Sequence, residues 1–293
     1  METVLRGTGK ETVIGPGRPF CIIGERINPT GKKRLTRAIR EADWSHLQRM
    51  AVRQVEAGAG VIDVNVGVPG VNEPEAMRCA VKAIQEVVDV PISLDSSTIE
   101  SLLVGMEAVE GRPLVNSVPA EPDYMRRLLP AIKDRDAAMI GICMRGGPSM
   151  PESAGERLEI ARTLLAESEK HGIAPEDVII DVIVLTIGAD HRTALTSLDS
   201  IRRVTQELGN NTTVGLSNIS FGLPNRSFLN AIMVAMAAQA GLTAAVVDPT
   251  SPEMRRAVRA LDMFKGNDEY CANWIEAFRR EQTEMAAQEA ESG

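Results

Sequence analysis

The sequence predicts an α/β protein with one large (β/α)8 TIM-barrel domain, on three observations. Short apolar runs rich in β-forming residues alternate with longer segments of helical periodicity along the whole 293-residue chain. Eight such runs can be counted, and no connection between them is short enough for a hairpin, which favours parallel strands closed into a barrel. Hydrophobic residues make up 44% of the chain but aromatic residues only 3%, so the core must consist of Val, Ile, Leu, Ala and Met, as in buried parallel sheets.

The eight predicted strands are spread evenly over the chain, with a helical segment between each pair. In order they are Phe20–Gly24, Gly60–Asn65, Val90–Asp95, Pro113–Ser117, Ala138–Met144, Val178–Val182, Thr213–Ser217 and Ala244–Val247. The helical segments show apolar residues at a spacing of three or four, as at Leu47, Ala51 and Val55. This alternation is typical of βα units.

Both ends of the chain lie outside the predicted barrel. Glycine and proline gather in residues 1–19, which we expect to form an extended arm. From Ile275 the chain is rich in Glu, Ala, Gln and Arg, so a terminal helix that frays is expected within residues 271–293. The barrel is assigned to residues 20–270.

Composition narrows the classes of partner. The net charge of −8 and the pI near 5.1 argue against nucleic acid, which is held mainly by Lys and Arg. No apolar run approaches the ~20 residues that span a bilayer, so no membrane segment is expected. The four cysteines form no C-x-x-C pair and follow no signal peptide, which predicts reduced thiols in a cytoplasmic protein.

Polar residues stand where the predicted strands end, and in a (β/α)8 barrel that is the side of the active site. In order they are Glu25 and Asn28, Asp63 and Asn65, Asp95 and Ser96, Asn116 and Ser117, Met144 and Arg145, Asp181, Ser217 and Asn218, and Asp248. Any one of them could simply cap the next helix, since Asp, Asn and Ser dominate N-caps. As a set, the carboxylates of Asp63, Asp95 and Asp181 would converge on one pocket, where they need hydrogen-bond donors.

Two kinds of ligand could stabilise three carboxylates in one pocket, one by donating hydrogen bonds and one by its positive charge. A pterin presents its 2-amino group and N3–H as a pair that suits one bidentate carboxylate, and its other nitrogens can reach a second carboxylate or an amide. A divalent cation such as Mg²⁺ or Ca²⁺ is the competing interpretation of three aspartates. Zinc is disfavoured because the chain has 3 histidines and no two histidines or cysteines at metal-ligand spacing.

Several of these segments together resemble the methyltetrahydrofolate-binding methyltransferases. The motifs are Ile23-Gly24-Glu25-Arg26-Ile27-Asn28-Pro29-Thr30-Gly31, Val61-Ile62-Asp63-Val64-Asn65, Leu94-Asp95-Ser96-Ser97, Val115-Asn116-Ser117, Ile180-Asp181, Val214-Gly215-Leu216-Ser217-Asn218 and Asn225-Arg226. That family includes the enzyme that methylates the corrinoid iron-sulfur protein and the folate domain of cobalamin-dependent methionine synthase. The resemblance covers roughly residues 20 to 270 and implies a pterin-binding, dihydropteroate synthase-like barrel.

The resemblance also implies a role for each candidate residue. Asp95, Asn116 and Asp181 would hold the pterin edge, with Asp63 and Asn65 close by. Ser217 belongs to the same binding set, and Arg226 would lie near the ring or the folate tail. Asn218 matches the family's mobile asparagine, which hydrogen-bonds pterin N5 and is the candidate catalytic residue. No metal is expected to be bound by this chain.

The implied reaction moves a methyl group between N5 of tetrahydrofolate and the cobalt of a corrinoid (cobalamin). The chain lacks the D-x-H-x-x-G segment that binds corrinoid in methionine synthase, so the corrinoid is expected on a separate protein that docks over the barrel mouth. By analogy with catabolic members, we expect transfer from the methylated corrinoid protein to tetrahydrofolate in a demethylation pathway, and a homodimer. A dihydropteroate synthase-like enzyme and a non-catalytic folate-binding protein stay open as alternatives.

Overall fold

Eight parallel strands surround one central interior in the computed structural model, which describes residues 1–147 and 150–292, with side chains through residue 283. The strands are β3 (Cys21–Ile27), β4 (Val61–Val64), β5 (Ile92–Asp95), β6 (Leu114–Pro119), β7 (Ala138–Ile142), β8 (Val178–Asp181), β9 (Thr212–Thr213) and β10 (Ala244–Val247). They pair in the order β10-β3-β4-β5-β6-β7-β8-β9. A bridge between Gly215 and Val246 joins the two ends of this order, so the predicted (β/α)8 barrel is confirmed.

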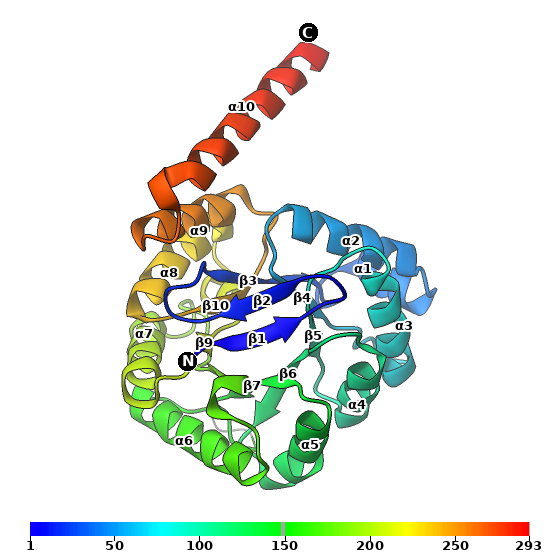
Figure 1. The fold of residues 1–293 in the computed structure, drawn as a ribbon, viewed down its shortest axis with the longest axis vertical. Coiled ribbons are helices and arrows are strands. Elements are labelled where there is room, and N and C mark those ends of the chain that lie inside the picture. Colours follow the sequence, from blue (N-terminus) through cyan, green and yellow to red (C-terminus); the bar gives the residue numbers. More distant parts are fainter. Residues whose placement is uncertain (148–149, 293) are drawn as a thin grey trace.

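The strands alternate with helices that cover the outside of the sheet, as Figure 1 shows. The helices are α1 (Lys33–Arg40), α2 (Trp44–Glu56), α3 (Glu73–Gln85), α4 (Ile99–Ala108), α5 (Pro122–Asp134), α6 (Ala154–Lys170), α7 (Thr193–Arg203), α8 (Arg226–Ala240), α9 (Pro252–Phe264) and α10 (Ala272–Ser292). Local signals set their ends. A capping box of Ser153 and Glu156 starts α6, Ser251 caps α9 ahead of Pro252, and α8 stops at Gly241, whose φ is 119°.

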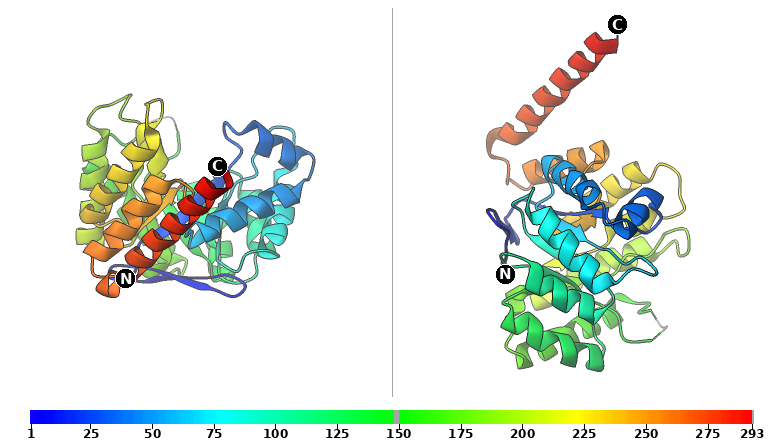
Figure 2. Two further views of the ribbon diagram at one scale, coloured as in Figure 1. Left: turned by 90° about the horizontal axis from the view of Figure 1, so that it is seen from above. Right: turned by 90° about the vertical axis from the view of Figure 1, so that its right-hand side faces the viewer.

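The N-terminal residues form a hairpin instead of the expected extended arm. Strands β1 (Thr3–Arg6) and β2 (Glu11–Ile14) pair antiparallel. Figure 2 shows this hairpin across one end of the barrel, opposite the loops that lead from the strands to the helices. Its turn requires Gly7, because a Cβ there would lie 2.1 Å from the carbonyl oxygen of Asp89.

The hairpin closes the barrel because its apolar side chains enter the interior. Leu5 and Ile14 are 0% exposed and belong to a buried cluster with inward residues of β3, β4, β6, β7, β8 and β10. Strands of four residues are too short to show a clear alternation of apolar and polar residues, and the buried contacts of this hairpin depend on the closed barrel.

Beyond the barrel, α10 projects away from the rest of the molecule (Figures 1 and 2). It starts at Ala272, three residues before the helical tail expected from the composition. Glu281 ties it to α9 through Arg256 at 2.9 Å and Arg259 at 3.2 Å. No helix in the described ranges is both long and apolar enough to cross a membrane.

Candidate functional site

The barrel interior has an apolar layer and a polar layer. Side chains two residues apart on a strand point to the same face. Ile23, Val61, Leu114 and Ile179 belong to the buried cluster under the hairpin, and Glu25, Asp63, Asn116 and Asp181 stand two positions further along the same four strands. The polar residues therefore face the mouth of the barrel, at the carboxyl ends of the strands.

Asp63 is the most deeply buried carboxyl group of this layer, at 2% exposure. Its Oδ1 accepts hydrogen bonds from Ser93 Oγ at 2.6 Å and Asn116 Nδ2 at 3.1 Å. Burial raises the pKa of Asp63 well above its usual value, and the neighbouring Asp95 carboxylate raises it further. Burial and the neighbouring carboxylate both favour the protonated form of Asp63.

Asp95, the last residue of β5, is the partner of Asp63. A hydrogen bond joins the two carboxyl groups, and it favours the ionised form of Asp95. Asn65 also hydrogen-bonds Asp95, and Asn28 Nδ2 lies 3.4 Å from its Oδ2. Burial nevertheless raises the pKa of Asp95 above its usual value. A neutral Asp63 next to an ionised Asp95 is the arrangement that these contacts favour.

Asp181 ends β8, on the far side of β7 from the Asp63 cluster. Its Oδ1 accepts the backbone N–H of Ile183 at 2.7 Å. Burial raises the pKa of Asp181 to about 6, against the effects of that N–H and of the Arg157 charge. The described contacts include no hydrogen bond from Asp181 to Asp63, Asp95 or Asn116, so the layer holds two separate carboxylate positions.

The seventh predicted strand, Thr213–Ser217, is wrong over most of its length. The strand β9 is only Thr212–Thr213, and a 3-10 helix occupies Leu216–Ser220. The chain turns because the backbone N–H of Asn218 donates to the carbonyl of Gly215 at 3.2 Å. Ser217 and Asn218 therefore lie on a short helix above the strand end instead of on the strand itself.

Asn218 is exposed, and it is the side chain of this short helix that is free to meet a ligand. Gly215 gives it room, since a Cβ at that position would lie 3.1 Å from Asn218 Nδ2. Ser217, in contrast, is held: its Oγ donates to Glu25 Oε1 at 2.8 Å. Burial raises the pKa of Glu25, which the Ser217 hydroxyl opposes and the Asp248 carboxylate reinforces.

Arg226, the first residue of α8, braces the same short helix. Its Nη2 donates to the carbonyl of Ser217 at 2.8 Å, its Nε donates to Ser220 Oγ at 3.2 Å, and its guanidinium lies 5.7 Å from the ring centre of Phe221. Glu25, Ser217, Arg226 and Asp248 line a common cavity of ≈ 170 Å³. Residues from the first sequence motif and from the last two motifs thus lie together at one side of the mouth.

The alternative that these residues merely cap helices is wrong for all of them. The N-cap positions of α3, α4, α5, α7 and α8 are occupied by Asn72, Thr98, Glu121, Arg192 and Asn225. The next α-helix after Asn218 is α8, which begins at Arg226, eight residues further on, with Asn225 as its N-cap. None of the polar residues of the mouth therefore occupies the N-cap of one of these helices.

Comparison with known proteins agrees with this arrangement. Residues 24–248 match the family described as "Pterin binding enzyme". The methylcorrinoid:tetrahydrofolate methyltransferase of Eubacterium limosum is 33% identical over 268 residues, which cover 89% of this chain and 97% of that protein. This chain belongs to the pterin-binding enzymes. The resemblance drawn from the strand-end motifs is thereby confirmed.

Other pterin-binding relatives match more distantly. Methionine synthase of Mycobacterium leprae is 28% identical over 239 residues, which are 77% of this chain but 20% of that protein. Among solved structures, dihydropteroate synthase of Xanthomonas albilineans has a TM-score of 0.66 at 19% identity and covers 92% of this chain, and that of Yersinia pestis has 0.64 at 15%. At these identities the solved structures establish the fold alone.

Two residues of the site, Ser93 and Arg157, were not among the sequence candidates, and a third, Glu25, was named only as a polar residue at a strand end. Ser93 could have been found, because it is a polar residue two positions before Asp95 in an otherwise apolar strand. Glu25 stands in the first motif, but nothing in the sequence pairs it with Ser217. Arg157 carries no signal, since an arginine on a helix is normally exposed. The described residues include no cluster of three or more His, Cys, Asp or Glu suited to a metal ion.

Proposed function

We propose that this pterin-binding enzyme is a methyltransferase that moves a methyl group between N5 of tetrahydrofolate and the cobalt of a corrinoid on a separate protein. The observation that carries the proposal is the polar layer at the barrel mouth, with carboxyl groups in two positions above an apolar interior. The Eubacterium limosum relative is 33% identical to this chain over nearly its own full length, and its name describes the same activity.

Pterin recognition is assigned to Asp95, Asn116 and Asp181, with Asp63 and Asn65 behind them. An ionised carboxylate accepts two N–H groups of the pterin edge. Asp63 supports this role of Asp95 because the hydrogen bond between the two acids favours the proton on Asp63 and the charge on Asp95. Asp181 offers a second acceptor from β8.

Asn218 is assigned to pterin N5. Methyl transfer to or from N5 requires that charge on this nitrogen be stabilised while the carbon–nitrogen bond forms or breaks. A carboxamide accepts from N5–H⁺ through its oxygen and donates to neutral N5 through its nitrogen, so one side chain serves both protonation states. The exposed position of Asn218, with Ser217 and Arg226 fixing the helix beneath it, supports the assignment.

The corrinoid supplies a cobalt that donates or accepts the methyl group, and its carrier is expected to dock over the mouth. We propose transfer from the methylcorrinoid protein to tetrahydrofolate, the direction in the name of the Eubacterium limosum relative. A cytoplasmic location is proposed because all four cysteines, Cys21, Cys79, Cys143 and Cys271, are free thiols.

A homodimer is proposed on the outer face of α8. Phe228, Ile232 and Met236 are 52%, 49% and 47% exposed and recur every four residues, which places them on one side of the helix. An uncharged helix face can meet its own copy across a two-fold axis without bringing like charges together. Light scattering on wild type and Ile232→Glu tests it: a dimer that becomes a monomer supports the face, and an unchanged mass excludes it.

Two measurements test the function. Calorimetric titration of metal-free protein with tetrahydrofolate and 5-methyltetrahydrofolate should show binding. Methyl transfer between cobalamin and the folate, followed by the cobalamin spectrum, should show turnover. Absence of folate binding would remove the proposal, whereas folate binding without transfer to any corrinoid protein would favour the non-catalytic alternative. Conversion of a pterin pyrophosphate and p-aminobenzoate would favour the dihydropteroate synthase alternative.

A further inference from the structure

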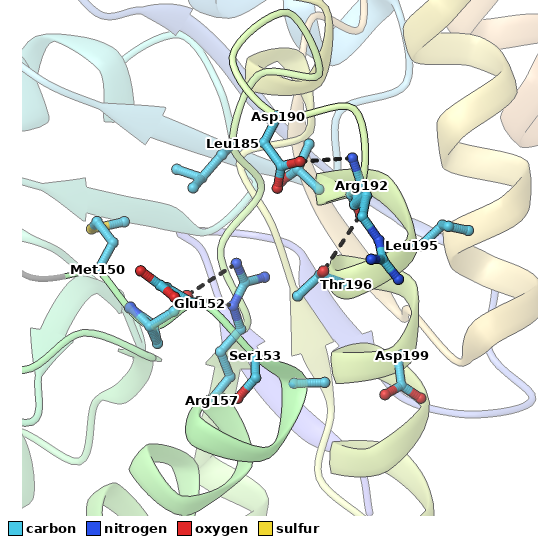
Figure 3. Close-up of a pocket in the computed structure, with 13 residues that line it drawn as sticks. Met150, Glu152, Ser153, Arg157, Leu185, Asp190, Arg192, Leu195, Thr196 and Asp199 are labelled. Atoms are coloured by element: carbon cyan, nitrogen blue, oxygen red, sulfur yellow. Dashed lines mark hydrogen bonds between the residues drawn. The ribbon is translucent and has the colours of Figure 1, made fainter.

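Arg157, in the first turns of α6, is a buried cation beside the barrel mouth. It is 2% exposed and lies at the wall of a cavity of ≈ 840 Å³ between α6 and α7 (Figure 3). In the part of the chain that the structure describes, Arg157 makes no salt bridge. A guanidinium buried without a carboxylate is costly unless neutral acceptors replace water around it.

The acceptors of Arg157 come from three separate segments. Its Nη1 donates to the carbonyls of Val182 at 3.0 Å and Ile183 at 2.9 Å, and lies 3.3 Å from Ser197 Oγ on α7. Its Nε and Nη2 each lie 3.4 Å from the carbonyl of Pro151, on the loop before α6. The planar fork of arginine suits such divergent contacts, whereas the single ammonium of lysine does not.

The turn that Arg157 contacts has an unfavourable backbone. Ile183 has a φ of 66°, in the left-handed region that β-branched residues rarely adopt. Its N–H donates to Asp181 Oδ1 at 2.7 Å, and its side chain is 7% exposed. Such a conformation persists only where surrounding contacts enforce it. Here the carbonyls on either side of that backbone bend both accept from Arg157.

We propose that Arg157 is a positioning residue for the pterin site. Its hydrogen bonds hold the backbone of Ile183 in the left-handed conformation. The Ile183 N–H, held in this way, fixes the orientation of the Asp181 carboxylate. The proposal rests on the function above, because it takes Asp181 as a pterin contact. Arg157 itself is buried behind the turn, and we assign it no contact with the substrate.

The decisive variants are Arg157→Lys and its combination with Ile183→Gly. Lysine keeps the charge but loses most of the contacts, so Asp181 should lose its fixed orientation and tetrahydrofolate should bind about tenfold more weakly. KM should rise with kcat nearly unchanged, because the Asp181 contact is the same in ground and transition states. Glycine adopts a φ of 66° without strain, so Ile183→Gly should restore most of the affinity in the Arg157→Lys background.

Arg112→Met is the matched control. Arg112 is 9% exposed, donates to the carbonyls of Val4 and Asp136, and serves the opposite end of the barrel. Its loss should lower Tm and leave folate affinity unchanged. Wild-type affinity in Arg157→Lys, or a tenfold loss that Ile183→Gly does not relieve, would overturn the inference. Wild type that fails to bind folate would overturn the proposed function instead, so the two failures are distinguishable.

Discussion

At the end of the barrel where the strands begin, Leu5 and Ile14 of the hairpin fill the interior and pack against apolar neighbours such as Ile23 and Val61. At the other end, two residues further along the same strands, the interior turns to Glu25 and Asp63, whose pKa values burial raises. One end therefore buries apolar surface at a gain in stability, while the other buries carboxyl groups that prefer water.

This difference implies a division of labour along each strand. Residues of the closed end should govern the free energy of unfolding and leave ligand affinity alone. Residues of the mouth should govern affinity and rate, and their removal should leave stability equal or higher. Asn211 and Asp177 at the closed end are matched controls for Asn218 and Asp95 at the mouth.

Leu5→Ala should have the largest effect. Leu5 is 0% exposed, and its loss leaves a cavity under the barrel floor, so the free energy of unfolding should fall by about 2–5 kcal/mol. Denaturant titration measures the fall. Folate affinity of the folded variant should equal that of wild type, and a parallel loss of affinity would show that the hairpin and the mouth are coupled.

Asn218→Ala should lower the single-turnover rate of methyl transfer by ~10²–10³, the usual cost of removing one preorganised polar group aimed at a transition state. Folate affinity should fall much less, because N5 is a weak contact in the ground state. Asn211→Ala is the control, since Asn211 Nδ2 bonds Thr3 Oγ1 at 3.0 Å and the carbonyl of Ile14 at 2.9 Å at the closed end. It should lower stability and spare the rate; a wild-type rate in Asn218→Ala would refute the mechanism at N5.

Much of this arrangement could be predicted from the sequence, because the signal was a residue pattern along single strands. Apolar runs that hold Asp63, Asp95 and Asp181 at or near their ends were sufficient to predict both the strands and the mouth that they face. The two asparagines of the site, Asn65 and Asn116, were predicted from the same strand-end motifs. Their roles as ligands of a pterin stay predictions.

What the sequence could not predict depends on contacts between distant segments. The hairpin is stable only because the barrel receives Leu5 and Ile14. The strand before Ser217 ends early because the carbonyl of Gly215 accepts a backbone hydrogen bond that turns the chain. A glycine in the sequence is not sufficient to predict such a 3-10 helix. Arg157 finds its acceptors on the loop before its own helix and on the loop and helix of the next βα unit, which no local pattern encodes.

Asp95→Ala should weaken folate binding by ~1.5–3 kcal/mol, the range for a charge-assisted hydrogen bond that loses one partner. Asp63 should then lose the neighbour that raises its pKa, so its own pKa should fall toward the usual range. Calorimetry measures the affinity. Asp177→Ala is the matched change at the closed end, where Asp177 pairs with Arg112 at 2.7 Å, and it should leave affinity intact. Equal affinities of both variants and wild type would remove Asp95 from the pterin site.

Asp181→Asn should have the smallest effect and an unusual sign: it should stabilise the protein at neutral pH. Burial raises the pKa of Asp181 to about 6 in the folded protein, from an ordinary value of 3.8. Between those values the folded state keeps a proton that the unfolded chain releases, so wild-type stability falls as pH rises through this window. Asparagine cannot ionise, and its Oδ1 can still accept the Ile183 N–H.

The groups facing Asp181 are the Arg157 guanidinium, a side chain that stays charged in proteins, and the Cys143 thiol, whose pKa burial raises away from this window. The variant should therefore match wild type near pH 3, below the ordinary pKa of 3.8, and exceed it by about 1 kcal/mol at pH 7.5, a value reduced from the full shift because water reaches part of the mouth. Denaturant titration at the two pH values measures this difference, and folate affinity should fall in the same variant. A variant less stable than wild type at pH 7.5 would mean that Asp181 stabilises the barrel, and the division between its two ends would fail at this strand.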